Sequence, residues 1–296
     1  MEMTEETTNS KAYRPLVSVL MTVYNRQDFI GEAIESVLKS SYPIFELIIV
    51  DDCSKDNSVE IVQGYVSKDS RISLYVNEKN LGDYCNRNKA ATYAKGKYIK
   101  YLDSDDKFYD FSLDYCVNIM EQNPGAKWGL LSFANEDEGI LLTPEQSMRR
   151  HFITKPFLTI GPDGSIYKKE FFEKIGGFST IYGPANDVFT NIMAAANGNL
   201  VLMTKDFFYY RLHDGQEMNN RYGYLFNNYC LNKDLFSFLK VFFTRKEILY
   251  LENKNKRRFT LNILRYFLDT LNFPKTYFAI KQAKFSIKDA FQGIFH

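Results

Sequence analysis

Tyr98-Ile99-Lys100-Tyr101-Leu102-Asp103-Ser104-Asp105-Asp106 runs from a segment of β type directly into three carboxylates within four positions. Acids spaced this closely repel one another, so a fold that keeps them ionised commonly gives them a cation to share. Mg²⁺ and Mn²⁺ prefer carboxylate oxygen, often with a substrate phosphate completing the shell. An isolated stretch of this kind is more often a solvated turn before a helix, so its position in the chain decides between the two interpretations.

The composition is that of an ordinary globular protein. The 296 residues are 45% hydrophobic and 25% charged, and a chain of this length forms one large domain or a domain with an appendage. The net charge of +1 is unevenly distributed, because residues 231–296 hold 13 Lys and Arg against 5 Asp and Glu. That segment therefore carries +8 and residues 1–230 carry −7. The sequence predicts a mildly acidic body with a basic, aromatic C-terminal segment.

The cysteines favour a reducing compartment. Cys53, Cys85, Cys116 and Cys230 lie far apart without a C-x-x-C pair, so neither a zinc site nor a disulfide framework is predicted. Residues 1–14 are polar, lack the apolar core of a signal peptide and are expected to be a disordered leader. No apolar run approaches the ~18–20 residues that span a bilayer. We expect a cytoplasmic protein, with peripheral contact at the inner face of the membrane as a further hypothesis.

Apolar runs and helical patterns alternate through the first hundred residues. Such alternation predicts an open α/β sheet, in which ligands collect beyond the carboxyl ends of the strands. The predicted strands are Leu16–Val23, Phe45–Val50, Ile72–Val76 and Tyr98–Leu102, and the predicted helices begin near Asp28, Ser58 and Gly82. Three strands end in polar residues that suit a nucleotide: Thr22 to Asn25, Asp51-Asp52 and Asp103 to Asp105.

The same turns argue against two other kinds of nucleotide site. The sequence has no G-x-x-x-x-G-K-[ST] and no G-x-G-x-x-G after its first strand, which argues against a P-loop and a dinucleotide Rossmann site. Because the sequence has no glycine-rich phosphate loop, we expect a metal ion held by the aspartates to neutralise the phosphates.

Four segments together resemble a known family. Val17–Asn25, Leu47–Ser54, Asn80-Leu81-Gly82 with Arg87-Asn88, and Tyr101–Asp106 are similar in order and spacing to family 2 inverting glycosyltransferases. The resemblance implies the GT-A fold, an open, mainly parallel sheet flanked by helices. It also implies a nucleotide-sugar donor, with a UDP-sugar expected, and a Mn²⁺ or Mg²⁺ ion bound at the D-x-D motif.

The resemblance assigns roles by position. The implied nucleotide-binding residues are Thr22, Tyr24, Asn25, Asp52, Arg87, Asp103 and Ser104. Among these, Asp52 would accept from the uracil ring and Asp103 would face the ribose. The implied metal ligands are Asp105, Asp106 and His213, with the choice between Asp105 and Asp106 left open. Cys53 stands where the family often has Gly or Asn.

The second half contains a segment similar to the acceptor side of the family. Gly161–Tyr167 precedes a helix that ends in Gly176-Gly177-Phe178, and Gly164 and Ser165 are the implied acceptor-side residues. The glycines are equally explained by turns that need them. Asn135–Pro156 is polar and is expected to be irregular, either over the site or as a plain surface excursion.

Asp187 is the implied catalytic base. It opens a helix after Tyr182-Gly183-Pro184, where the family places an acidic pair, although the first member here is Asn186. The alternative is an acid in the first helical turn, which stabilises by ~0.5–2 kcal/mol. His213 follows a predicted strand, Phe207–Leu212, and could instead be a simple surface residue.

The remainder, 221–296, is predicted to be a helical and basic C-terminal segment appended to a catalytic domain of residues 15–220. Its apolar residues recur at helical spacing on either side of the basic run Lys254–Arg258. Such stripes are usually helices packed on the body, and basic charge with exposed aromatics also suits anionic lipid. No motif supports binding to nucleic acid.

The predicted function is metal-dependent transfer of a sugar from a nucleoside-diphosphate sugar to a hydroxyl, with inversion. The acceptor is expected to be a saccharide or a lipid-linked molecule in cell-surface polysaccharide or glycolipid synthesis. The alternative is a non-catalytic nucleotide-sugar-binding or scaffold protein, suggested by Asn186. A nucleotidyltransferase would need a glycine-rich loop where this chain has Tyr24-Asn25.

Overall fold

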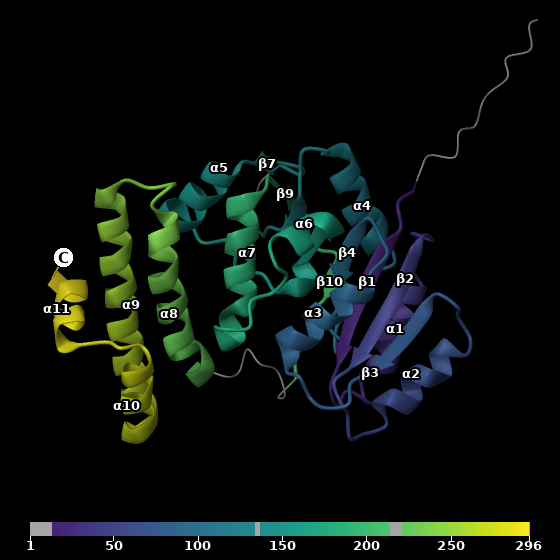
Figure 1. The fold of residues 1–296 in the computed structure, drawn as a ribbon, viewed down its shortest axis with the longest axis horizontal. Helices are drawn as coiled ribbons and strands as arrows, with labels where there is room; N and C mark the ends of the chain where they lie inside the picture. Colours follow the sequence, from purple (N-terminus) through teal and green to yellow (C-terminus); the bar gives the residue numbers. More distant parts are fainter. Residues whose placement is uncertain (1–13, 134–136, 214–220, 296) are drawn as a thin grey trace, which may run out of the picture.

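The computed structural model describes residues 14–133, 137–213 and 221–295, so all but the last residue of the predicted leader lies outside it. Across these residues the chain forms a sheet of eight strands (Figure 1), in the order β3-β2-β1-β4-β8-β6-β9-β7. The strands are β1 (Val17–Val23), β2 (Phe45–Asp51), β3 (Ile72–Val76), β4 (Tyr98–Tyr101), β6 (Trp128–Leu131), β7 (Leu141–Leu142), β8 (Ser165–Lys168) and β9 (Leu200–Met203). A separate antiparallel pair joins β5 (Lys107–Phe108) to β10 (Phe208–Tyr209).

The first half of the sheet is parallel. β1 pairs with β2 and β4, and β2 pairs with β3, all in the parallel sense. These strands are nearly continuous apolar runs because helices cover both faces, which is the usual reason for such runs in α/β proteins. The four strands predicted from the sequence are confirmed to within a residue at each end.

β8 interrupts the parallel order at the centre of the sheet. It lies between β4 and β6 and runs antiparallel to both. Because β8 runs in the opposite direction, the turn that precedes it meets the carboxyl end of β4. The segment before Ser165 is thereby placed beside Asp103.

Two helical layers enclose the sheet. One face, which includes Val19 and Ile49, packs on α1 (Ile30–Leu38), α2 (Ser58–Val66) and α4 (Ser112–Gln122). The other face, which includes Leu20 and Ile48, packs on α3 (Asp83–Tyr93), α5 (Pro144–Arg149), α6 (Lys169–Lys174) and α7 (Asn186–Asn197). Successive residues of each strand thus pack into hydrophobic clusters on opposite faces of the sheet, because side chains alternate along a β-strand.

The C-terminal segment is helical, as predicted. It comprises α8 (Arg221–Leu239), α9 (Arg245–Thr270), α10 (Phe273–Gln282) and α11 (Ile287–Phe295). Figure 1 places these helices beyond α7, with α11 on the outer side of α9. Leu235, Phe243 and Leu251 join the same hydrophobic cluster as the second face of the sheet. Among the described residues, no helix combines the length and apolar character that crossing a bilayer requires.

The prediction of an irregular segment over Asn135–Pro156 is wrong for most of its described part. This part contains β7, α5 and a single π-helical turn over Arg150–Thr154, in which His151 is buried. The cause is local: Thr143 and Gln146 form a capping box around Pro144, which starts a helix within a polar stretch.

The predicted strand Phe207–Leu212 was too long, because only Phe208–Tyr209 is paired, in β10. The residues after Tyr209 turn instead towards the carboxylates at the end of β4, where Arg211 and His213 make contacts. β9, which had no counterpart in the predictions, pairs in parallel with β6.

Candidate active site

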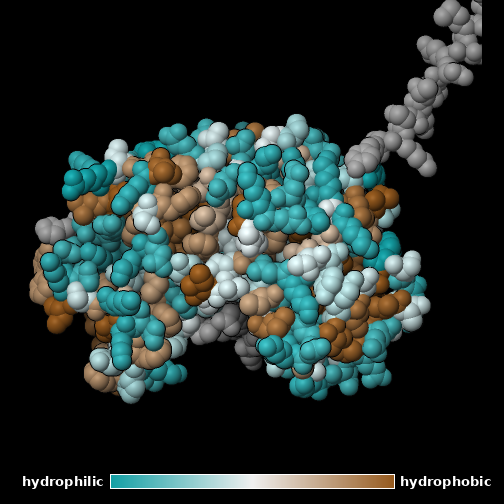
Figure 2. All heavy atoms as spheres, viewed as in Figure 1, coloured by the Kyte–Doolittle hydropathy of each residue, from teal (hydrophilic) through white to brown (hydrophobic). Residues whose placement is uncertain are grey.

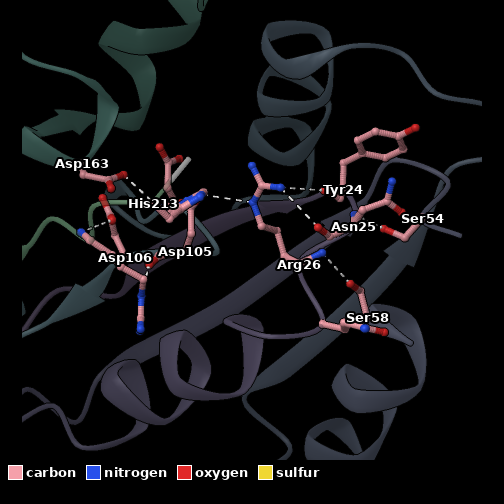
Figure 3. Close-up of polar contacts among 12 residues, drawn as sticks. Tyr24, Asn25, Arg26, Ser54, Ser58, Asp105, Asp106, Asp163 and His213 are labelled. Carbon is pink, nitrogen blue, oxygen red and sulfur yellow. Dashed lines mark hydrogen bonds and ion pairs between the residues drawn. The ribbon is translucent and has the colours of Figure 1, made fainter. Parts of the chain in front are cut away.

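Side-chain hydrogen bonds join the turns that follow β1 and β2 (Figure 3). Asn25 has φ 52°, the left-handed conformation that Asn tolerates better than most residues. Its N–H donates to Ser54 Oγ at 2.9 Å, and its side-chain oxygen accepts from the Lys55 N–H at 2.8 Å. The polar turns after the two strands therefore form one structural unit.

Arg26, which the sequence predictions missed, links this unit to the end of β4. Its Nε lies 3.0 Å from Asp105 Oδ2, and its Nη1 donates to the carbonyl of Asn25 at 3.2 Å (Figure 3). The only available signal was a cation directly after the polar strand end Tyr24-Asn25. Its partner lies 79 residues away, so spacing along the chain could not identify the contact.

Asp52 is occupied by contacts within the protein. Its Oδ1 accepts from Asn77 Nδ2 and from the Leu81 N–H, each at 2.8 Å, and Oδ2 accepts from the Gly82 N–H at 2.9 Å. The side chain is buried, whereas Tyr24 nearby along the edge is 46% exposed and Thr22 is half-buried. Asp52 thus holds the turn that starts α3, and its contact with a nucleoside stays a prediction.

Arg87 and Asp103, both predicted to bind nucleotide, meet in the structure. Arg87 projects from α3 and is buried, with Nη1 2.6 Å from Asp103 Oδ1 and Nε 2.8 Å from Asp83 Oδ1. The Tyr101 hydroxyl donates to the main-chain carbonyl of Arg87 at 2.9 Å, which fixes α3 against β4. The burial of Asp103 raises its pKa even though Arg87 opposes the shift.

Three carboxylates converge behind this pair. Asp103, Asp106 and Asp163 each offer an oxygen, and these atoms lie within 4.8 Å of one another. Asp163 Oδ1 accepts from the Asp103 N–H at 2.9 Å, while Oδ2 of Asp106 and Oδ2 of Asp163 are buried and accept from no nitrogen or hydroxyl donor. Burial raises the pKa of Asp106 to about 6, although hydrogen bonds with Asp163 and the Arg211 N–H oppose the shift. Burial and repulsion from Asp103 and Asp106 raise the pKa of Asp163 well above its usual range.

Asp163 was not among the predicted site residues, although it lies in the quoted segment Gly161–Tyr167. In the sequence, Asp163 is a polar residue in a Gly-Pro turn before an apolar strand. Its position beside Asp103 follows only from the antiparallel direction of β8, which the sequence did not predict. Lys100 stabilises this turn, because its Nζ donates to the main-chain carbonyl of Asp163. The Lys100 ammonium is fully buried between the rings of Phe108 and Phe207, 5.0 and 4.9 Å from their centroids, and burial lowers its pKa.

Asp105 belongs to a different group from Asp106. Asp105 Oδ2 lies 3.0 Å from His213 Nε2, and the His213 ring stacks on Phe29 with centroids 4.9 Å apart. Arg211 joins the two groups: its Nε donates to the Asp105 carbonyl at 2.8 Å and its N–H donates to Asp106 Oδ1 at 2.9 Å. The structure thus brings together two of the predicted metal ligands, Asp105 and His213, and places the third, Asp106, with Asp103 and Asp163.

The predicted acceptor-side residues are buried. A Cβ at Gly164 would lie 2.2 Å from Ile160 Cγ2, and the Ser165 hydroxyl donates to the Pro162 carbonyl at 2.8 Å. They shape the turn that carries Asp163, and contact with an acceptor stays a prediction. Ser104, which lies between Asp103 and Asp105 in the sequence, is also buried.

Asp187 stands at the start of α7, on the second face of the sheet. Its Oδ1 accepts from the Val188 N–H at 2.6 Å, and it interacts electrostatically with Arg87 and Asp103. Burial raises the pKa of Asp187 to about 7, against the stabilising effects of the Val188 N–H and Arg87. A carboxylate with this pKa can take up a proton near neutral pH.

Comparison with known proteins places this geometry in a family. The chain is 44% identical over 108 residues to the putative teichuronic acid biosynthesis glycosyltransferase TuaG of Bacillus subtilis, covering 36% of this chain and 43% of TuaG. The match thus spans less than half of that relative.

Two solved structures share the fold at 18% sequence identity. S. aureus TarS in complex with UDP-GlcNAc superposes with a TM-score of 0.62, covering 90% of this chain and 91% of that one. The mannosyltransferase PcManGT of Pyrobaculum calidifontis, in complex with GDP-Man and Mn²⁺, gives 0.64 with 94% and 78% covered. The family model of Glycosyl transferase family 2 matches residues 18–176, which hold β1 to β4, the carboxylates and β8. The chain therefore belongs to the family 2 glycosyltransferases and has the GT-A fold.

Proposed function

We propose that this chain transfers a sugar, with inversion, from a nucleoside-diphosphate sugar to an acceptor hydroxyl. A UDP-sugar is the donor that we expect, since TarS was solved with UDP-GlcNAc. The observation that carries the proposal is the convergence, at the carboxyl ends of β1, β2 and β4, of five acidic or basic side chains that suit a diphosphate and its cation. These are Arg26, Arg87, Asp103, Asp105 and Asp106.

The residues fit a hard divalent cation, Mn²⁺ or Mg²⁺. Two of the carboxylate oxygens, on Asp106 and Asp163, are buried and accept from no nitrogen or hydroxyl donor, and all-oxygen donor sets suit these ions. One candidate set is Asp103, Asp106 and Asp163, and the other is Asp105 with His213. When bound, the ion would neutralise the charge of the departing diphosphate.

Asp187 is the general base in this proposal. Its carboxylate takes the proton of the acceptor hydroxyl while that oxygen forms a bond to the anomeric carbon. The bond from this carbon to the diphosphate oxygen breaks, and the nucleoside diphosphate leaves with the electron pair. One displacement inverts the anomeric centre, so no nucleophile from the protein takes part. Base catalysis of this kind contributes roughly 10²–10⁴-fold.

The acceptor class and the compartment are also proposals. The name of TuaG supports an acceptor in cell-surface polysaccharide synthesis, either a free saccharide or a lipid-linked one. Cys53, Cys85, Cys116 and Cys230 are free thiols, which supports a reducing cytoplasmic location.

The test is a donor-hydrolysis screen of UDP-, GDP- and dTDP-sugars with Mn²⁺ and without acceptor. We expect slow hydrolysis of one donor that depends on the ion and on Asp187, because water then replaces the acceptor hydroxyl. Binding of a nucleotide sugar without hydrolysis or transfer would favour the non-catalytic alternative. Hydrolysis that is unchanged in Asp187→Asn would refute the assigned base.

A further inference from the structure

The last helix, α11, packs on the protein with its polar side. Gly293 lies against the backbone of α9, where an added Cβ would come 2.5 Å from the Arg257 nitrogen. On the same side, Asp289 Oδ1 and Gln292 Oε1 lie 3.3 and 2.7 Å from Lys256 Nζ. An amphipathic helix on the surface of a globular protein normally packs with its apolar stripe against the core. In α11 the polar side takes that place.

The apolar stripe of α11 consequently faces outward. It consists of Ile287, Phe291, Ile294 and Phe295, which are 50–79% exposed and recur at helical spacing. The rings of Phe291 and Phe295 stack on each other, with centroids 5.8 Å apart. The two phenylalanine rings thus pack together on the surface.

The stripe continues along α9 and α10. Arg257, against which Gly293 packs, shares one side of α9 with Leu261, Leu264 and Leu268, because these residues are four, seven and eleven positions further on. All three leucines are more than half exposed, as are Leu271, Phe273 and Tyr277 at the junction with α10. The stripes of α9, α10 and α11 together are called the C-terminal apolar face. Figure 2 shows hydrophobic residues among hydrophilic ones over this end of the molecule.

The charges around the C-terminal apolar face are mainly positive. Residues 254–296 contain nine Lys and Arg and only two Asp, and one of these acids, Asp289, is paired with Lys256. Lys254 and Arg258 lie towards α8 and His151, and the other exposed cations are Arg257, Arg265, Lys275, Lys281, Lys284 and Lys288. A second copy of the chain would bring the same positive charge to the contact and repel it, whereas an anionic surface would be attracted.

We propose that the C-terminal apolar face binds the surface of an anionic lipid bilayer. Phe291, Phe295 and their neighbours enter the region between head groups and acyl chains, and the surrounding Lys and Arg side chains contact lipid phosphates. In Figure 1, α10 and the end of α9 lie on the lower side of the molecule, the side towards which β1 and β2 run. α11, which carries Phe291 and Phe295, lies on the outer side of α9. The proposal does not depend on sugar transfer.

The experiment is co-sedimentation of the full chain with phosphatidylcholine vesicles that contain or lack phosphatidylglycerol. Two variants address the two components of binding: Phe291→Ser with Phe295→Ser, and Lys284→Glu with Lys288→Glu. We expect each to weaken partition onto the anionic vesicles by about tenfold or more, and added salt to weaken wild-type binding as well. The matched control is Lys240→Glu with Val241→Ser, which changes an exposed cation and an exposed apolar residue in the turn between α8 and α9. Its partition should stay at the wild-type value.

Three results would overturn the proposal. The first is a wild-type chain that stays in the supernatant with anionic vesicles. The second is equal binding to both kinds of vesicle. The third is a dimer, detected by sedimentation velocity and broken by Phe291→Ser with Phe295→Ser, in a chain that binds no lipid; the occupant would then be a second copy. All substituted side chains are exposed, and the circular dichroism of each variant verifies its fold.

Discussion

Asn186 and Asp187 are adjacent but serve different partners. The side-chain oxygen of Asn186 is buried and accepts from the Tyr182 N–H at 2.8 Å, so it closes the turn that leads into α7. An amide oxygen accepts this bond as a carboxylate would. The hydrogen bond that closes this turn therefore does not require an acid at position 186.

Replacing Asp187 tests its role as the base. We expect Asp187→Asn to lower kcat by about 10²–10⁴-fold with little change in donor affinity, because the amide keeps the shape and loses the basic oxygen. Transfer kinetics and a titration with the nucleoside diphosphate measure the two effects. Asp110→Asn, at an exposed acid outside the site, is the control and should transfer at the wild-type rate. Equal loss of binding and rate would indicate a structural role for Asp187.

The pKa of Asp187 predicts the pH dependence of transfer. Burial raises it to about 7, and the base acts only when it is deprotonated, so kcat/KM should rise with pH and reach half its plateau near pH 7. Initial rates at subsaturating donor, measured over a pH series at constant ionic strength, give this profile. A profile that is flat on its acidic side would contradict the assignment.

The two candidate cation sets can be separated by paired substitutions. Asp163→Asn removes a carboxylate oxygen from the group with Asp103 and Asp106, and Asp105→Asn removes one from the pair with His213. Because each amide is a weaker ligand for a hard cation, the variant in the true set should need about tenfold or more Mn²⁺ for half-saturation. Electron paramagnetic resonance of free Mn²⁺ measures this directly. Unchanged Mn²⁺ binding in both variants would place the ion elsewhere.

At the scale of the element, the turn between α3 and β4 depends on Gly96. A Cβ here would lie 2.6 Å from the Ser18 nitrogen and 2.7 Å from the Leu16 carbonyl oxygen, both backbone atoms at the start of β1. Gly96→Ala should therefore destabilise the fold by about 1–3 kcal/mol, as overpacking does. Urea denaturation measures the change in the free energy of unfolding.

The matched control for Gly96 is Gly64, inside α2. Nothing lies within 4 Å of the position that its Cβ would take. Gly64→Ala should stabilise by about 0.5–1 kcal/mol, because alanine favours the helical backbone. Substitutions of the same kind are thus expected to have opposite signs. Similar destabilisation by both would show that close contact at Gly96 is not the cause.

The elements that the sequence predicted well are those specified by their own residues. Val17–Val23 and Phe45–Asp51 are apolar runs bounded by turns, and their burial on two faces follows from that pattern. The direction of β8 cannot be found in this way, because its four residues, Ser165–Lys168, would suit either sense of pairing. For the same reason Asp163 was missed, while Asp103 and Asp106 were identified on the continuous stretch that follows β4.

At the scale of the whole molecule, the C-terminal helices are part of the core. Phe243, between α8 and α9, is buried and packs edge-on against Phe152, with ring centroids 6.0 Å apart. The predicted domain boundary near residue 220 therefore divides the chain between two regions that contribute to one hydrophobic cluster. The predicted catalytic domain and C-terminal segment are expected to unfold together.

Phe243→Ala tests this coupling. Loss of the buried ring should lower the free energy of unfolding by about 3–5 kcal/mol. The single tryptophan, Trp128, is buried in β6 and reports on the sheet, whereas circular dichroism at the helical band is weighted towards the long helices. The two signals should shift together in denaturant. Phe273→Ala, at an exposed ring on α10, should leave both midpoints unchanged. Separate transitions in the wild type would show that the two parts are independent.

The central, antiparallel position of β8 has a consequence for synthesis of the chain. β4 is complete at Tyr101, but its second neighbour in the sheet is made only when the ribosome reaches Ser165–Lys168. Until then the growing chain carries β4 as an open strand edge, which invites pairing with other chains. The same event that closes this edge delivers Asp163 to Asp103. Protection from aggregation and assembly of the carboxylate group are therefore one step in the biogenesis of the protein.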